Sequence, residues 1–211
     1  MANLYLLSDE YTIGVDEVGR GSLFGNVVVG AVILPTPLND DDIKMYNKIK
    51  DSKKLSQKKR KELAIYIKDK ALTFGIGEMN NDDIDKYNIL QCTLKSSHKA
   101  LNQAYLKRPF NKIIIDGIHF NGFIAPGIED NDIIEYECIP KGDSKYLNIA
   151  AASIIAKDYH DEQIINLVNL NPELEKYDLL NNKGYGTEKH IKAIQTFGIT
   201  KYHRKSFSGC K

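Results

Sequence analysis

Three consecutive isoleucines at positions 113–115 restrict the possible folds of this chain more than any other feature of its sequence. A continuous β-branched run is typical of a strand buried on both faces, because a strand with one solvated face alternates apolar and polar residues. Helices must then cover both sides of the sheet, so the run predicts an α/β fold. Asp116 and Gly117 follow it and place a carboxylate at the end of a central strand. An Asp-Gly pair is also common in turns that merely end a strand.

Two adjacent carboxylates, Asp16 and Glu17, follow another β-branched segment at residues 12–15. Residues 27–34 are also β-branched and apolar, and we expect them to pair with this segment as a hairpin. Successive side chains of a strand point to opposite faces, so Asp16 and Glu17 cannot both face solvent. Two anions beside a core strand are unfavourable unless a cation holds them. The pair therefore indicates either a cation site, which Asp116 would join if the two strands are neighbours, or a charged turn.

Two further segments carry glycines beside a side chain that suits a polar ligand. Gly19, Arg20 and Gly21 combine flexible backbone, N–H groups and one fixed positive charge, which suits a phosphate or a sugar. Tyr185 lies between two glycines and has room to present its ring to a sugar or a base. Packing within a turn is the alternative role for Tyr185.

The net charge is only +1, but basic residues gather in two stretches. Residues 48–61 contain eight Lys or Arg against one acid, and residues 183–211 contain seven against one. Such runs are usually solvated faces. Beside a carboxylate site they are better explained by a nucleic-acid backbone, because phosphates attract cations.

Length and composition favour one compact domain over residues 1–211. The chain is 42% hydrophobic, which provides a sizeable core. No apolar run approaches the roughly 18–20 residues that span a bilayer, and the start of the chain lacks a secretory pattern. We therefore expect a soluble, cytoplasmic protein.

Three cysteines, Cys92, Cys138 and Cys210, show no paired spacing. The sequence therefore suggests neither a zinc site nor a disulfide framework. Clustered carboxylates without cysteine, and without histidine at ligand spacing, favour a hard ion such as Mg²⁺ or Mn²⁺. We expect Cys92 and Cys138 to be small core residues and Cys210 to be an exposed thiol.

Periodicity and capping residues predict the elements around these motifs. The apolar period from residue 84 to 106 indicates one long amphipathic helix. Small residues open a helix from Asn148, which allows it to approach the sheet closely. The other expected elements are strands over 73–79 and 133–139, helices over 58–70 and 188–197, and a polar turn over 38–42.

Several blocks of the sequence resemble, in the same order, the motifs of type 2 ribonucleases H, and within that family they are most similar to bacterial ribonuclease HII. The blocks are Asp16-Glu17-Val18-Gly19-Arg20-Gly21, Lys141-Gly142-Asp143-Ser144, residues 151–157, and Gly184-Tyr185-Gly186-Thr187 with His190. The resemblance extends over residues 13–207. It implies a ribonuclease H-like α/β fold, in which helices flank a mixed central sheet and the portion from about residue 164 onward is helical.

The resemblance also implies roles for individual residues. Four carboxylates, Asp16, Glu17, Asp116 and Asp143, would hold two divalent ions, Mg²⁺ or Mn²⁺. Gly19, Arg20, Gly21, Lys53, Ser144 and Tyr185 would contact the substrate. The chain departs from the family where His160 replaces the usual arginine before Asp161. Asp161 keeps the acidic position, and either assists metal or water handling or hydrogen-bonds within its helix.

The implied activity is hydrolysis of the RNA strand of RNA·DNA hybrids and incision 5′ of single ribonucleotides in duplex DNA. The implied products carry 5′-phosphate and 3′-hydroxyl ends, and the implied task is removal of misincorporated ribonucleotides and RNA primers. Because the 2′-hydroxyl distinguishes RNA from DNA, the Gly-Arg-Gly block and Tyr185 are candidate sensors of ribose. We expect a monomer, without a sliding-clamp-binding motif after Phe207.

Two other functions stay open. Another metal-dependent nuclease of the same fold, such as a junction resolvase, would need the carboxylates but neither the Gly-Arg-Gly block nor Tyr185. A nucleic-acid-binding module without catalysis would suit the basic stretches, but the presence of all four carboxylates counts against it. Cleavage assays separate these functions, since fold alone does not choose among them.

Overall fold

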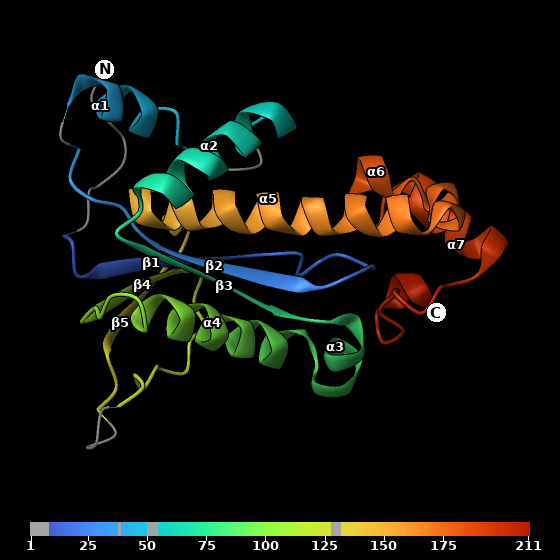
Figure 1. The fold of residues 1–211 in the computed structure, drawn as a ribbon. Coiled ribbons are helices and arrows are strands. Elements are labelled where there is room, and N and C mark those ends of the chain that lie inside the picture. Colours follow the sequence, from blue (N-terminus) through green and yellow to red (C-terminus); the bar gives the residue numbers. More distant parts are fainter. Residues whose placement is uncertain (1–8, 38, 50–54, 128–131) are drawn as a thin grey trace.

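A computed structural model of the chain describes residues 9–37, 39–49, 55–127 and 132–211, and a five-stranded sheet forms its centre (Figure 1). In spatial order the strands are β3 (Thr73–Met79), β2 (Val27–Ile33), β1 (Thr12–Val18), β4 (Lys112–Asp116) and β5 (Glu135–Ile139). The pairs β3–β2 and β2–β1 are antiparallel, whereas β1–β4 and β4–β5 are parallel. The sheet is therefore mixed, as predicted, with β5 at an edge.

Helices lie on both faces of this sheet (Figure 1). On one face runs α5 (Leu147–Leu170), with α2 (Gln57–Lys70) packed on its outer side, and α4 (Ile89–Tyr105) covers the other face. The remaining helices are α1 (Asp40–Tyr46), α3 (Asn81–Tyr87), α6 (Leu179–Asn182) and α7 (Glu188–Phe197). The last two belong to a C-terminal portion beyond the end of the sheet.

The isoleucine run of β4 is buried on both faces, which confirms the prediction from its sequence. Ile113 and Ile115 belong to an apolar cluster that includes Leu101 of α4. Ile114 points to the opposite face and belongs to a cluster with Ile149 of α5. Each of the three isoleucines is at most 4% exposed. Burying this much apolar surface on both sides, at roughly 25 cal/mol per Å², contributes to the stability of the layered fold.

Two glycines let α5 lie directly on β1 and β2. A Cβ atom on Gly14 would lie 2.3 Å from the carbonyl carbon of Asn148, and one on Gly30 would lie 2.4 Å from the carbonyl oxygen of Ala152. The Asn148 side chain also joins the strands, because its Nδ2 donates to Thr12 O at 2.9 Å and its Oδ1 accepts from Leu34 N at 3.1 Å. This close approach sets the position of α5 relative to the acidic end of β1.

Three predicted elements differ from the structure. β1 continues through Val18, so Asp16 and Glu17 lie within the strand and not after it, because pairing with β2 extends that far. The predicted polar turn starts α1 instead, because Asn39 accepts hydrogen bonds from two backbone N–H groups of the first turn. The predicted long helix is interrupted at Asn88, whose φ of 68° ends α3 and whose side chain caps α4.

The C-terminal portion packs against the loop that follows β1. Leu23 and Phe24 of that loop share an apolar cluster with residues of α5 and α7 and with Cys210. The prediction of an exposed Cys210 is wrong: this residue is 7% exposed and its Sγ lies 3.6 Å from Leu23 O, because the tail folds back. Cys92 is buried as predicted, whereas Cys138 is only half-buried.

Side-chain caps and strand boundaries elsewhere confirm the expectations from local sequence. Ser56 caps α2, and Thr187 caps α7, which ends at Gly198. β3 has the expected bounds. Within the part of the chain that the structure describes, no helix has the length and apolar character needed to cross a membrane.

Candidate active site

Parallel pairing of β1 with β4 places the carboxylates of these two strands next to each other. Val15 pairs with Ile115, so Asp16 and Asp116 come next on neighbouring strands that run in the same direction. The two strands are neighbours, which was the condition for Asp116 to join a site with Asp16. The position at the carboxyl ends of parallel strands is a common location for sites in α/β proteins.

Asp16 is a buried carboxylate, only 6% exposed. Burial raises its pKa well above the ordinary value, and the negative charges of Glu17 and Asp116 raise the pKa further. Two donors act in the opposite direction, namely the Ser153 hydroxyl and the backbone N–H of Glu17, which lies 2.7 Å from Asp16 Oδ1. Such a raised pKa, caused by burial and like charges, is typical of functional carboxylates.

Nearby donors contact the carboxylates of Glu17 and Asp116, and Asp143 lies on a turn attached to Asp116. Glu17 Oε1 pairs with Arg20 Nη1 at 3.3 Å. Asp116 Oδ1 accepts a hydrogen bond from Gly142 N at 2.6 Å, which attaches to β4 the short 3₁₀ turn Gly142–Ser144 that carries Asp143. Among the residues described, no three or more His, Cys, Asp or Glu side chains are grouped as a metal site. The four-carboxylate metal centre therefore stays a prediction.

A cleft of about 360 Å³ opens beside Asp16. Its lining combines the two β1 carboxylates, the Gly-Arg-Gly block and Tyr185, although Tyr185 is far from the others in sequence. The residues that line it are Asp16, Glu17, Val18, Gly19, Arg20, Gly21, Ser153, Lys157 and Tyr185. Negative oxygens, a cationic edge and an aromatic ring thus share one concave surface, which suits a sugar-phosphate ligand.

Two predicted substrate residues are not among those that line this cleft. Ser144 is exposed and its Oγ donates to Lys141 O at 2.8 Å, whereas Lys53 lies outside the described residues. Conversely, sequence reasoning did not assign roles to Ser153 and Lys157, which line the cleft. Their spacing of four residues on α5 was the available signal, because residues i and i+4 lie on the same face of a helix.

Asp161 is buried, at 3% exposure, among three side chains that donate hydrogen bonds to it. Its Oδ2 accepts from Arg60 Nη2 at 2.8 Å, and its Oδ1 accepts from Lys157 Nζ at 2.8 Å and His160 Nδ1 at 3.2 Å. Burial alone would raise the pKa of Asp161, yet His160 and Lys157 lower it. Asp161 therefore connects α2 to the Lys157 side chain, and His160 takes part in the same network.

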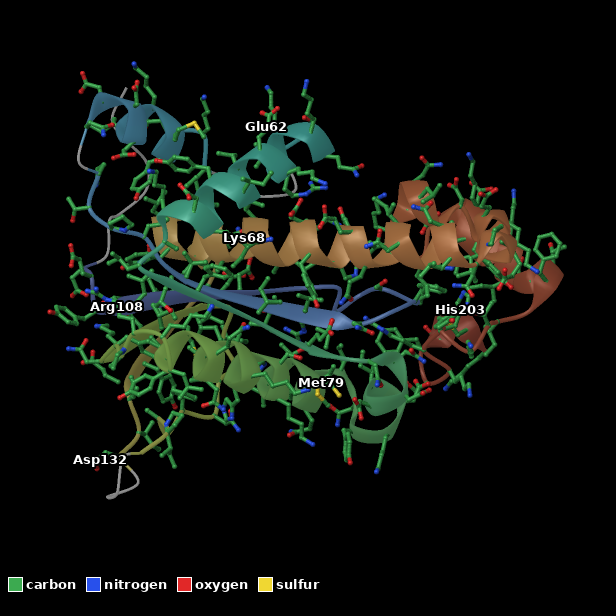
Figure 2. The ribbon with its side chains drawn as sticks, viewed as in Figure 1. Glu62, Lys68, Met79, Arg108, Asp132 and His203 are labelled. Atoms are coloured by element: carbon green, nitrogen blue, oxygen red, sulfur yellow. The ribbon has the colours of Figure 1, made fainter. Side chains whose placement is uncertain are left out.

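His190 and His203 form a buried pair behind Tyr185 (Figure 2 labels His203). Thr200 N donates to His203 Nδ1 at 3.0 Å, so in the neutral ring the hydrogen of His203 is on Nε2. That Nε2 donates to His190 Nε2 at 3.1 Å, and His190 Nδ1 then donates to Tyr185 O at 2.9 Å. The chain of hydrogen bonds requires both rings to be neutral and fixes the backbone of Tyr185.

Acidification is expected to disrupt this pair. Burial, with the charge of His190, lowers the pKa of His203 to about 4, against about 6.5 in the unfolded chain. The unfolded state therefore binds more protons as pH falls below 6.5, so the stability from neutral His203 is lost between pH 6.5 and 4. Between pH 7.5 and 4.5 we expect the parent to lose about 2 kcal/mol more unfolding free energy than His203→Asn, measured by urea titration. Equal losses would contradict this assignment.

Comparison with known sequences also indicates a nuclease. The sequence model of the family described as Ribonuclease HII matches residues 13–210. The chain is 40% identical over 204 residues to Ribonuclease HII of Parabacteroides distasonis, covering 97% of this chain and 93% of that protein. It is 42% identical over 194 residues to Ribonuclease HII of Christiangramia forsetii, covering 92% and 88%.

Solved structures show the same fold. Ribonuclease H2 from Pyrococcus horikoshii OT3 superposes with a TM-score of 0.70 at 21% identity, covering 94% of both chains. Bst-RNase HIII in complex with Mn²⁺ gives a TM-score of 0.67 at 24% identity, covering 94% of this chain and 67% of that one. These likenesses confirm the ribonuclease H-like architecture. With the sequence matches, which extend over nearly the whole chain, they establish that the chain belongs to the ribonuclease HII family of endonucleases.

Proposed function

We propose that this chain hydrolyses the RNA strand of RNA·DNA hybrids and incises duplex DNA on the 5′ side of a single ribonucleotide. The products would carry 5′-phosphate and 3′-hydroxyl ends, and the task would be removal of misincorporated ribonucleotides and RNA primers in the cytoplasm. The observation that carries this proposal is the cleft that combines Asp16 and Glu17 with Arg20 and Tyr185. Carboxylates suit metal-assisted phosphodiester hydrolysis, and the other two groups suit detection of a ribose.

The residues around Asp16 fit a hard divalent cation. Asp16 is buried beside the charges of Glu17 and Asp116, a repulsion that a cation would relieve. The candidate donors are carboxylate oxygens, the ligands that Mg²⁺ and Mn²⁺ prefer. We propose that Asp16, Glu17, Asp116 and Asp143 hold two such ions. When bound, the ions would supply Lewis acidity toward the phosphate and the attacking water. The Mn²⁺ complex of a structural neighbour is consistent with divalent-metal dependence.

The chain's own residues would orient the reacting groups. Ser153 and the Glu17 amide hold the Asp16 carboxyl, and Gly142 N holds that of Asp116. Lys157 Nζ lies 5.3 Å from the centre of the Tyr185 ring. This places a cation beside the aromatic surface, where it would meet a phosphate next to the bound sugar. Held in this way, these groups need little rearrangement when the substrate binds.

The basic stretch over 183–211 contains Tyr185 itself and so borders the cleft. Its exposed lysines would bind the backbone of the flanking duplex, namely Lys189, Lys192, Lys201, Lys205 and Lys211. Two residues of the stretch over 48–61 form ion pairs within the protein instead. Arg60 is buried and pairs with Asp161, and Lys61 pairs with Glu162 at 2.7 Å. Binding of the flanking duplex should weaken steeply as salt rises.

The test of the proposed function is incision of a DNA duplex that contains one ribonucleotide, with Mg²⁺ or Mn²⁺ and with chelator, beside an all-DNA duplex. Cleavage on the 5′ side of the ribonucleotide, only with metal, is the expected result. Cleavage of all-DNA junctions without regard to ribose would support a resolvase instead. Binding without any cleavage would support a non-catalytic module.

Tyr185→Ala is expected to lower kcat/KM on the single-ribonucleotide duplex by about 10- to 100-fold, because stacking on an aromatic ring is worth about 1–3 kcal/mol. Tyr185→Phe would separate the contribution of the hydroxyl from that of the ring. Tyr11→Ala is the matched control, since Tyr11 is 55% exposed before β1. If Tyr185→Ala and Tyr185→Phe both cleave as fast as the parent, Tyr185 does not read the ribose.

A further inference from the structure

Arg204 is a buried arginine whose guanidinium binds a single loop. The residue is fully buried, at 0% exposure. Its hydrogen-bond acceptors are four backbone carbonyls of the segment 19–26, which connects β1 to β2. Nη1 donates to Gly19 O at 2.7 Å and to Arg20 O at 3.2 Å, Nε donates to Gly25 O at 3.0 Å, and Nη2 donates to Asn26 O at 2.9 Å.

Backbone hydrogen bonds join the same loop to two other segments. Leu23 N donates to Gly184 O at 2.8 Å, which connects the loop to the residue before Tyr185. Gly25 N donates to Tyr202 O at 2.9 Å and Arg204 N donates to Leu23 O at 2.9 Å, which connect it to the C-terminal segment. The Gly-Arg-Gly block and Tyr185, both in the cleft, are thus held in one hydrogen-bonded unit with Arg204 at its centre.

The orientation of the loop follows from the planarity of the peptide bond. In a trans peptide the C=O and the N–H of the next residue point in opposite directions. Arg204 holds the carbonyls of Gly19 and Arg20, so the N–H groups of Arg20 and Gly21 point away from Arg204. Both of these residues line the cleft. Successive N–H groups directed to one side form a concave site for an anion or a hydroxyl oxygen.

We propose that Arg204 is a positioning residue for ribose recognition: it holds the Gly19–Arg20–Gly21 backbone so that two amides face the substrate. The assignment rests on the proposed function, because the ligand of these amides is the ribonucleotide. Arg204 touches no reacting atom and acts through the loop.

A guanidinium is required at this position, because it presents five N–H donors in a planar fork. Lysine carries the same charge but only three donors on one nitrogen, and it cannot reach carbonyls on both sides of the fork. Arg204→Lys therefore keeps the charge and removes the geometry. Arg204→Gln, which retains neutral donors and buries no charge, is the second variant. Arg108→Lys is the matched control, since Arg108 pairs with Glu10 at the opposite end of the sheet (Figure 2).

The experiment combines hydrogen exchange with kinetics on folded variants, verified by cooperative melting. For Arg204→Lys we expect faster exchange of the Arg20 and Gly21 amides, with exchange in α5 and β4 unchanged. We also expect kcat/KM on the single-ribonucleotide duplex to fall at least tenfold. The inhibition constant of an all-DNA duplex as competitor should stay within twofold of the parent value, because contacts to the flanking backbone are retained.

Each contrary result has a distinct meaning. If the parent discriminates ribose and both Arg204 variants do so equally well, the proposal is overturned while the proposed function stands. If protection falls throughout the protein, Arg204 is a structural residue and the proposal is also overturned. If the parent does not cleave any ribonucleotide-containing duplex, the proposed function fails, and the assignment of Arg204 to ribose recognition fails with it.

Discussion

Asp116→Asn is expected to reduce metal-dependent incision of a single-ribonucleotide duplex by at least about 10³-fold, a loss typical of removing a group that acts as part of a catalytic unit. The substitution removes one negative charge from the acidic end of the sheet. The amide oxygen of asparagine still accepts the hydrogen bond that Gly142 N donates to Asp116 Oδ1. The turn that carries Asp143 should therefore stay in place, and the loss should come from charge alone.

Stability provides the second readout for this variant. The charge of Asp116 raises the pKa of Asp16, so the two carboxylates repel each other across β1 and β4. Removing that repulsion should leave the unfolding free energy unchanged or slightly higher, by up to about 1 kcal/mol. Asp132→Asn is the matched control, because Asp132 is exposed at the lower left edge of the molecule in Figure 2. An Asp116→Asn enzyme with more than a tenth of the parent activity would remove Asp116 from the metal site.

Asp161→Ala is expected to lower the unfolding free energy by about 3–5 kcal/mol, because it leaves buried cations without their partner. Arg60 is only 7% exposed and its Nη2 lies 2.8 Å from Asp161 Oδ2. Lys157 Nζ, also at 2.8 Å, would lose the same carboxylate. For a chain of this size we expect the melting temperature to fall by roughly 10 °C, measured by calorimetry alongside urea titration.

The control for Asp161 is an ion pair on the surface. Asp41 pairs with Lys44 at 2.9 Å, but the Asp41 side chain is 88% exposed. Asp41→Ala should therefore leave the melting temperature unchanged within error, since exposed pairs contribute little. A similarly small effect for Asp161→Ala would show that α2 and α5 are held together without this network. The double variant Arg60→Met with Asp161→Leu should recover only part of the loss, because apolar packing often replaces a buried ion pair but Lys157 still lacks its carboxylate partner.

The core of the fold could be predicted because it depends on short patterns. The isoleucines at 113–115 required cover on both faces, and α4 and α5 provide it. The same reasoning put Asp116 at the end of a central strand, but the structure was needed to show that this strand lies next to the strand of Asp16. Boundaries were less predictable: hydrogen bonding to β2 extended β1 through Val18, and the positive φ of Asn88 divided a continuous apolar pattern into two helices.

The site could be predicted only in part. Asp16, Glu17, Arg20 and Tyr185 do share a cleft, and the resemblance in motifs pointed to all four of them. Ser153 and Lys157 escaped assignment because a helix of small residues shows no face by hydrophobic pattern alone. Cys210 was expected in solvent because a short tail carries no local signal that it will fold back on Leu23.

By itself the sequence determined the layered α/β class, the family and the carboxylates at the end of the central strands, because β-branched runs and motifs are written in neighbouring residues. Only the tertiary structure decided how the Gly19–Arg20–Gly21 loop is held. Arg204 binds the carbonyl of Gly19, 185 positions earlier in the chain. In the sequence, nothing distinguishes Arg204 from the other members of a basic stretch. Burial and hydrogen-bond partners depend on which distant segments come into contact, and the periodicity of the sequence does not indicate those contacts.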